Sequence, residues 1–137
     1  MEHEVKRAEI NARMVTCTYI LQSNMSRYNQ QEVPATCQIC KEEDETLNHM
    51  LLKCAAFTGE RAAFTGKFTQ ILDSRNSGIW DTILNNNFLL QLILDCTHPD
   101  VTVIIGDEQR LLCDIERATQ VYCHKIHMKR AHFLAYK

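Results

Sequence analysis

The sequence predicts an all-α fold in a single domain of about five helices, and three observations support this prediction. Apolar residues recur mostly at intervals of three and four positions, the period of one face of an α-helix. The chain has 137 residues, of which 45% are hydrophobic, so it can enclose one core. Cysteine and histidine at metal-ligand spacing separate the first helical stretch from the second. We therefore expect residues 1–137 to form one helical domain with a metal clip between its first and second helices.

The first helix is expected over residues 5–21. Its apolar face comprises Val5, Ala8, Ala12, Val15 and Tyr19. The polar stretch over residues 23–34 should end this helix, because asparagine and glutamine are frequent there and a proline closes it.

The next two helices are expected on either side of a loop. A second helical stretch is expected over residues 47–71, with a bend near Gly59 or Gly66, since glycine weakens a helix by about 1 kcal/mol. After the loop, Ser77 can cap a short third helix over residues 79–84.

The second half of the chain is predicted to contain a buried helix and a long closing helix. Residues 88–94 are apolar on almost every side, which is typical of a central, buried helix. Residues 101–105 are rich in β-branched side chains, but a single strand has no partner here, so we expect an extended connector. The closing helix is expected over residues 107–135, with acidic residues at its start and basic residues at its end, which matches the helix dipole.

The metal-ligand motif occupies residues 37–54 and reads C-x2-C-x8-H-x4-C. Two cysteines separated by two residues can turn both sulfur atoms toward one point, and a histidine and a cysteine can join them from the first turns of a helix. Three thiolates and one imidazole, without a carboxylate, suit tetrahedral Zn²⁺. Because this set fills all four positions, the sequence predicts one structural zinc ion. The predicted ligands are Cys37, Cys40, His49 and Cys54.

A simpler interpretation treats these residues as ordinary buried cysteines and a surface histidine. The residues between Cys40 and His49 argue against it, because they are polar and acidic and cannot enter a core. A metal clip would hold the two ends of this loop.

Four further cysteines bear on the cellular compartment. Cys17, Cys96, Cys113 and Cys123 lie in apolar, helix-like contexts, where a free thiol behaves as a small hydrophobe. We therefore expect no disulfide framework and a reducing compartment, the nucleus or the cytoplasm. No apolar run approaches the roughly 20 residues of a membrane helix, and the charges in the first twenty residues do not fit a secretory signal. We expect no membrane partner.

Catalytic interpretations have less support. Cys113 or Cys123 could pair with His124 or His127 as nucleophile and base, but only residue type supports this, and no Gly-rich phosphate loop is present. We expect no enzymatic activity and no small-molecule substrate. A second metal site at Cys123, His127 and His132 is a separate alternative, although these positions drift around a helix and a fourth ligand would have to come from elsewhere.

The residues before and within the motif carry a family resemblance. The run Thr16-Cys-Thr-Tyr-Ile-Leu-Gln-Ser-Asn-Met-Ser-Arg-Tyr-Asn29 is followed in order by the four metal ligands, with Glu45-Thr46 between them. This pattern closely resembles the region downstream of the polymerase in reverse transcriptases of invertebrate non-LTR retrotransposons, and the likeness extends to the final helix. The resemblance implies that the four ligands bind zinc and assigns no catalytic residue. It implies an accessory domain that helps to engage template RNA or target DNA.

The chain departs from that family because it contains neither the paired-aspartate motif of the polymerase nor an endonuclease. It is therefore expected to be either a piece of an element or a free-standing descendant. The net charge of −2 is not that of a strongly basic nucleic-acid binder. Phosphate neutralisation needs lysine and arginine, and single-stranded bases stack on aromatic rings. The predicted contacts with RNA or DNA are Arg13, Arg27, Tyr28, Lys125, Lys129 and Arg130.

A second hypothesis is a protein-interaction or oligomerisation module in which zinc only supports the fold. The near-neutral charge, the acidic motif loop and the surplus of apolar helix favour it. Trp80 and residues 88–94 would supply the contact face for a protein partner or a second copy.

Overall fold

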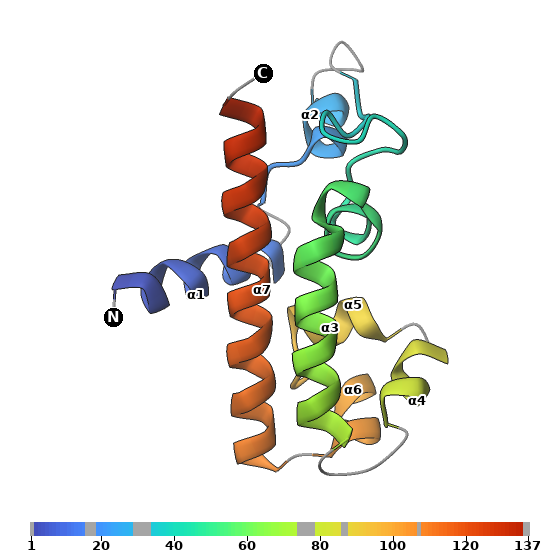
Figure 1. Ribbon diagram of the computed structural model, residues 1–137, viewed down its shortest axis with the longest axis vertical. Helices are drawn as coiled ribbons and strands as arrows, with labels where there is room; N and C mark the ends of the chain where they lie inside the picture. The colour runs from blue at the N-terminus through green and yellow to red at the C-terminus, as the bar shows by residue number, and fades with distance from the viewer. Residues whose placement is uncertain are drawn as a thin grey trace.

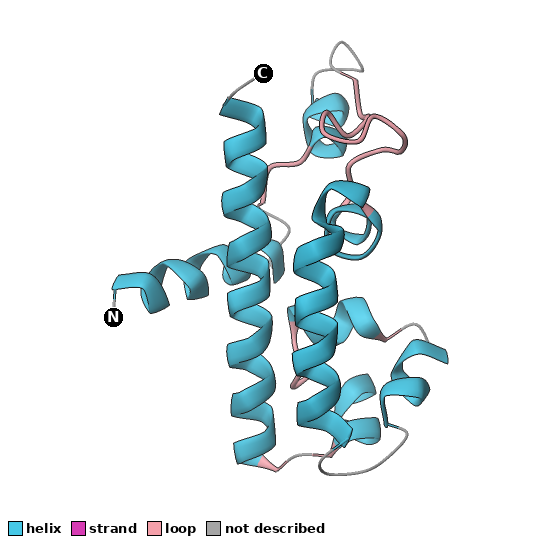
Figure 2. Ribbon diagram, in the orientation of Figure 1, coloured by secondary structure: helices cyan, strands magenta, loops and turns pink. Residues whose placement is uncertain are grey.

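The computed structural model is all-α, which confirms the predicted fold class. It describes residues 2–15, 19–28, 34–73, 79–85, 88–106 and 108–135. Within these ranges there is no strand, and the only β-type pairing is an isolated antiparallel bridge between Thr36 and Asp44. Helical ribbon accounts for most of the described chain (Figure 2).

Seven α-helices and two short helical turns make up the described fold. The α-helices are α1 (Glu2–Val15), α2 (Gln22–Tyr28), α3 (Thr58–Asp73), α4 (Ile79–Asn85), α5 (Leu89–Leu94), α6 (Pro99–Ile105) and α7 (Gln109–Ala135). The turns are a π-helical turn, η1 (His49–Lys53), and a 3₁₀ turn, η2 (Ala55–Phe57).

Helices α3 and α7 form the long axis of the molecule and run side by side in opposite directions (Figure 1). Helix α1 crosses α7 and packs on it, while α4, α5 and α6 gather around the end of α3 and the start of α7. Helix α2 and the metal-ligand motif lie at the opposite end, beside the C-terminal half of α7. The last turns of α7 therefore stand next to the motif, although they are far from it in sequence.

The helical period explains why α3 and α7 pack together. On α3, Phe64, Phe68 and Leu72 recur every four residues and are all buried, so they form one continuous stripe. The matching stripe on α7 comprises Leu111, Leu112, Ile115, Ala118, Tyr122, Cys123 and Ile126. Each large buried side chain contributes about 1.5–3 kcal/mol relative to an exposed one, so this seam contributes substantially to core stability. The predicted closing helix is confirmed, with α7 starting at Gln109.

The first helix differs from its prediction, because α1 ends at Val15 and the separate helix α2 occupies part of the stretch expected to be a polar break. A contact from outside the local sequence starts α2: the backbone N–H of Gln22 donates a hydrogen bond of 2.9 Å to the carboxylate of Glu45. A carboxylate at a helix N-terminus satisfies an unpaired N–H group and complements the helix dipole. A distant side chain thus supplies the start signal that the local sequence lacks.

The extended connector predicted over residues 101–105 is wrong, because these residues form helix α6. The side chain of His98 accepts a hydrogen bond of 3.2 Å from the backbone N–H of Asp100, and Pro99 occupies the first turn. Val101 and Ile105, four residues apart, are both buried on one helical face. Capping and burial together outweigh the weak β-preference of these side chains.

The bend expected in the second helical stretch lies elsewhere. Helix α3 continues through Gly59 and Gly66, and the interruption comes earlier, at Cys54, between the π-helical and 3₁₀ turns. The proposed cap Ser77 lies outside the described residues, but the short helix after it is present as α4. Residues 89–94 form the predicted helix α5, in which Leu92 and Ile93 are buried while Leu89, Leu90 and Leu94 are partly buried.

A pair of glycine substitutions tests the backbone of this fold. Gly106 ends α6 with φ +85° and ψ −175°, a conformation restricted almost entirely to glycine, so Gly106→Ala should destabilise the domain by about 1–3 kcal/mol. Gly66 lies inside α3, where Gly66→Ala should stabilise it by up to about 1 kcal/mol. An added Cβ meets nothing within 4 Å at either site, so only backbone conformation separates the two. Urea denaturation measures both, and shifts of the same sign would contradict the assigned end of α6.

Candidate metal centre

The four residues predicted as zinc ligands converge on one point. One candidate ligand atom from each of Cys37, Cys40, His49 and Cys54 lies within 4.8 Å of the other three. The residues Cys37, His49 and Cys54 are 1%, 4% and 0% exposed, and Cys40 is partly buried. The structure therefore confirms that these side chains form a cluster able to hold one metal ion.

The first two cysteines are placed by a tight turn. The backbone N–H of Lys41 donates to the carbonyl of Cys37 at 2.9 Å, and the N–H of Cys37 donates to the carbonyl of Glu43 at 2.8 Å. Lys41 has a positive φ of 61°, which reverses the chain immediately after Cys40. This reversal turns the following backbone N–H groups back toward the Cys40 sulfur.

Those N–H groups change the acidity of Cys40. Desolvation by partial burial alone would raise the pKa of this thiol, but hydrogen bonds from the backbone of Glu42 and Glu43 and from the neighbouring cysteines outweigh it and lower the pKa below its usual value. Hydrogen bonds to a sulfur stabilise its thiolate form, which is the form that binds metal.

The π-helical turn explains how His49 and Cys54 reach the same point. The N–H of Cys54 donates to the carbonyl of His49 at 2.7 Å, an i to i+5 bond. In an α-helix, residues five apart point about 140° away from each other, since each residue rotates by 100°. The wider π turn reduces this divergence, so the spacing of four intervening residues becomes compatible with one metal ion.

Two side chains from the long helices hold this turn in place. The carbonyl of Leu51 accepts hydrogen bonds from the hydroxyl of Tyr122 and from Arg61 Nε, the latter at 3.2 Å. Arg61 also donates to the carbonyl of Cys54 at 3.0 Å. These bonds satisfy carbonyl groups that a short helical turn leaves without partners, and they attach the motif to α3 and α7.

The imidazole of His49 is oriented from both sides. Its Nε2 lies 3.2 Å from the Sγ of Cys40, inside the cluster, and its Nδ1 lies 3.3 Å from a carboxylate oxygen of Glu43. An Nδ1–H that donates to a carboxylate leaves the Nε2 lone pair directed at the cluster, as is usual for histidine ligands of metals. Glu43 thus has a positioning role that sequence reasoning missed, because the loop contains four acidic residues that look equivalent.

The pKa values of the Cys40 and Cys54 thiols are shifted in opposite directions. Burial, followed by the proximity of Cys37 and Cys40, raises the pKa of Cys54 to about 12, while the pKa of Cys40 is lowered. Opposite shifts within one cluster are expected when like charges compete for a small buried volume. A divalent cation would remove this conflict, so the donor set fits a bound metal ion.

A buried ion pair joins the motif to the end of α7. Glu45, whose side chain is 2% exposed, accepts two hydrogen bonds from Arg130, at 2.8 and 2.7 Å. The guanidinium of Arg130 also lies over the ring of Tyr19, 5.6 Å from its centre, and the Tyr19 hydroxyl lies 2.7 Å from Nδ1 of His127. We call Tyr19, Glu45, His127 and Arg130 the clamp, because they connect the residues before α2, the motif and α7.

The structure places the predicted nucleic-acid contacts in different surroundings, and one of them, Arg130, belongs to the clamp. Arg130 has a largely buried side chain engaged with Glu45, which removes it from the exposed basic surface. Lys129 is 35% exposed and pairs with Glu60 at 2.9 Å, whereas Lys125 is exposed. Arg13 is exposed and pairs with Glu9 at 2.9 Å. The side chains of the remaining candidates, Arg27 and Tyr28 on α2, lie outside the described residues.

The alternative second metal site is not assembled by the described residues. Among the described residues, the cluster at the motif is the only group of three or more potential ligands, so Cys123, His127 and His132 do not form a second site. Cys123 is fully buried and accepts from the amide of Asn11 at 3.9 Å, while His127 is engaged with Tyr19. Cys96 is buried as expected, whereas Cys113 is exposed, and Cys17 lies outside the described residues.

Two further findings concern the described helices and the comparison with known proteins. None of the helices in the described part of the chain combines the length and the apolar character that crossing a bilayer requires. No protein-family model, curated protein or solved structure matches this chain significantly.

Proposed function

We propose that the cluster binds one Zn²⁺ ion with a structural role. Three sulfur atoms and one imidazole nitrogen form the soft to borderline donor set that tetrahedral zinc prefers. Ligands from a tight turn and a π turn surround the ion, and three of the four residues are almost completely buried. This closed donor set carries the proposal, because it leaves no position for a substrate or a reactive water.

The domain that this ion stabilises is proposed to be a non-catalytic accessory domain that contacts RNA or DNA. The resemblance of the motif to the retrotransposon segment supports this function, as does the exposed cationic residue Lys125 on α7. Because the zinc ion has only a structural role in this proposal, surface side chains would make the contacts with RNA or DNA.

Two measurements, metal content and nucleic-acid binding, test the zinc proposal and the nucleic-acid proposal separately. The purified chain should contain one zinc ion by mass spectrometry of metals, and Cys37→Ser should lose it, whereas the exposed, non-ligand variant Cys113→Ser should keep it. In a gel-shift titration, single-stranded RNA or DNA should bind in a salt-sensitive manner. No binding at low salt would refute the nucleic-acid proposal without affecting the zinc assignment.

The second candidate function is a protein-interaction or oligomerisation module. The observation in its favour is a set of exposed apolar side chains, among which Val103 is 85% exposed, Ile20 66% and Met128 55%. The contact face proposed at Trp80 has its side chain outside the described residues. Light scattering distinguishes the candidates, because a monomer at every concentration would exclude a stable homo-oligomer.

A further inference from the structure

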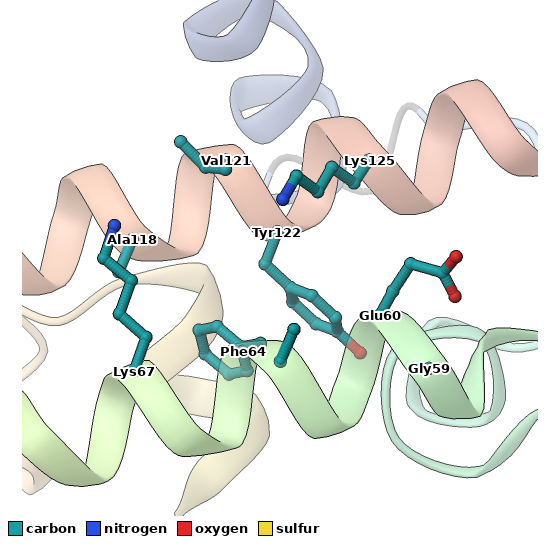
Figure 3. Close-up of a pocket in the computed structure, with 9 residues that line it drawn as sticks. Gly59, Glu60, Phe64, Lys67, Ala118, Val121, Tyr122 and Lys125 are labelled. Carbon is teal, nitrogen blue, oxygen red and sulfur yellow. The ribbon is translucent and has the colours of Figure 1, made fainter.

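The surface between α3 and α7 carries a groove made of two adjoining depressions. The first has a volume of about 450 Å³ and lies between the two helices, with Phe64, Lys67, Tyr122 and Lys125 among its lining residues (Figure 3). The second, of about 380 Å³, includes Arg7 and Arg117 in its lining. Lys67 and Val121 line both depressions, so the two form one continuous groove.

Three helices contribute positive charge to this groove: Arg7 comes from α1, Lys67 from α3, and Arg117 and Lys125 from α7. No ion pair or side-chain hydrogen bond joins any of these four to another residue whose side chain the structure describes, although the charge of Lys125 contributes to lowering the pKa of Glu60. Nε of Arg7 is buried without a hydrogen-bond partner among these residues.

The acidic residues of the groove are already engaged. Glu60 is held by Lys129 at 2.9 and 3.1 Å, and this hydrogen bond is the main reason that the pKa of Glu60 is lowered. Glu116 accepts a hydrogen bond of 3.3 Å from Gln120. Among the side chains that the structure describes, the groove therefore presents four cations against two carboxylates, of which Glu60 is neutralised mainly by Lys129 and Glu116 is bonded to an amide.

We infer that this groove binds the phosphate backbone of one nucleic-acid strand, an assignment that rests on the proposed function and names its binding site. Arg117 and Lys125 are eight residues apart on α7, about 12 Å along the helix. A strand that follows the groove could place one phosphate near each of the four cationic side chains, because these are spread along its length and come from three helices. We assign one strand rather than a duplex because the cations line a single groove between packed helices.

The floor of the groove determines what is recognised. The rings of Phe64 and Tyr122 stack on each other with centres 4.3 Å apart, and these residues are only 7% and 2% exposed. They cannot take a base on their faces, and the Tyr122 hydroxyl is already bonded to Leu51. Recognition therefore depends on phosphate and not on base stacking, so binding should be independent of base sequence.

Fluorescence anisotropy of the zinc-loaded full chain with a labelled 20-nucleotide oligouridylate tests this assignment. If four phosphates are neutralised, the logarithm of the association constant should fall with the logarithm of salt with a slope of about −2.8, which is roughly 50-fold between 50 and 200 mM. The single variants Lys67→Gln, Arg117→Gln and Lys125→Gln should each weaken binding and reduce the slope by about 0.7. Lys53→Gln, which removes an exposed charge on the π turn outside the groove, should change neither.

Further control measurements separate a failure of the groove assignment from a failure of the proposed nucleic-acid binding. Arg117→Lys should retain the slope of the parent chain, and thermal melts establish that each variant is folded. Salt-sensitive binding that the three groove variants leave unchanged would overturn the groove and preserve the proposed function. Absence of binding by the parent chain would overturn both. Equal competition by polyglutamate of the same length would show a general anion surface and overturn the assignment to nucleic acid.

Discussion

Replacing Cys54 with serine is expected to abolish the cooperative unfolding transition of the metal-binding end of the domain. Cys54 is fully buried, and it is linked through the π turn to His49 and through Arg61 to α3. Structural zinc sites bind with apparent free energies of about 10–16 kcal/mol, comparable to the entire stability of about 5–15 kcal/mol of a typical domain. Loss of the ion should therefore unfold or loosen the first half of the domain, including residues 34–57.

Circular dichroism melts and amide hydrogen exchange measure this effect. A zinc chelator should lower the melting temperature of the parent chain in the same way, and added zinc should restore it. Cys96→Ser is the matched control, because Cys96 is also a buried thiol but lies outside the cluster, so its substitution should be much milder. An unchanged melt after complete metal removal would defeat the structural role of the ion.

Removing one partner of the buried ion pair in the clamp should also have a large effect. Glu45→Ala leaves the guanidinium of Arg130 without its carboxylate and the N–H of Gln22 without its acceptor. Breaking a buried pair in this way typically costs about 3–5 kcal/mol, mostly because the remaining charge stays desolvated. Helix α2 should lose its starting contact at the same time.

Urea denaturation with saturating zinc measures the loss in free energy of unfolding for Glu45→Ala. Two comparison variants show whether this loss comes from the buried ion pair. Glu9→Ala removes the same type of side chain from an ion pair with Arg13 whose two side chains are more than half exposed, and it should cost about 1 kcal/mol or less. The double variant Glu45→Gln, Arg130→Met should be less destabilised than Glu45→Ala, because no buried charge remains unpaired. A loss of unfolding free energy below about 1 kcal/mol for Glu45→Ala would contradict the claim that the Glu45–Arg130 pair is desolvated.

The clamp and the π turn explain why the motif and α7 behave as one unit. Glu45 and Leu51, both within the motif, contact Arg130 and Tyr122 on α7. Binding of the proposed zinc ion would therefore organise a segment that also contacts the C-terminal half of α7. The face of α7 that forms the proposed groove includes Val121 and Lys125, which flank Tyr122. Metal loss should thus weaken strand binding indirectly, even though no ligand of the metal lines the groove among the described residues.

Local patterns predicted the elements whose signals are themselves local. The ligand spacing predicted the cluster of Cys37, Cys40, His49 and Cys54, since two short turns bring residues so close in sequence together. The apolar period predicted α7, because burial of one face requires that period. For α6 the β-branched composition predicts an extended segment, but the caps at His98 and Gly106 and the burial of one face favour a helix.

By itself, then, the sequence determined the helical class, the cluster of four potential metal ligands and the long closing helix. Only the tertiary structure decided that Gln22 begins a helix, that Arg130 is withdrawn from the surface, and that Arg7, Lys67 and Arg117 share a groove. The contacts of Glu45 with Gln22 and Arg130 cross 23 and 85 residues of sequence. A side chain's neighbours at such separations depend on how whole helices pack, and no local period or spacing encodes them.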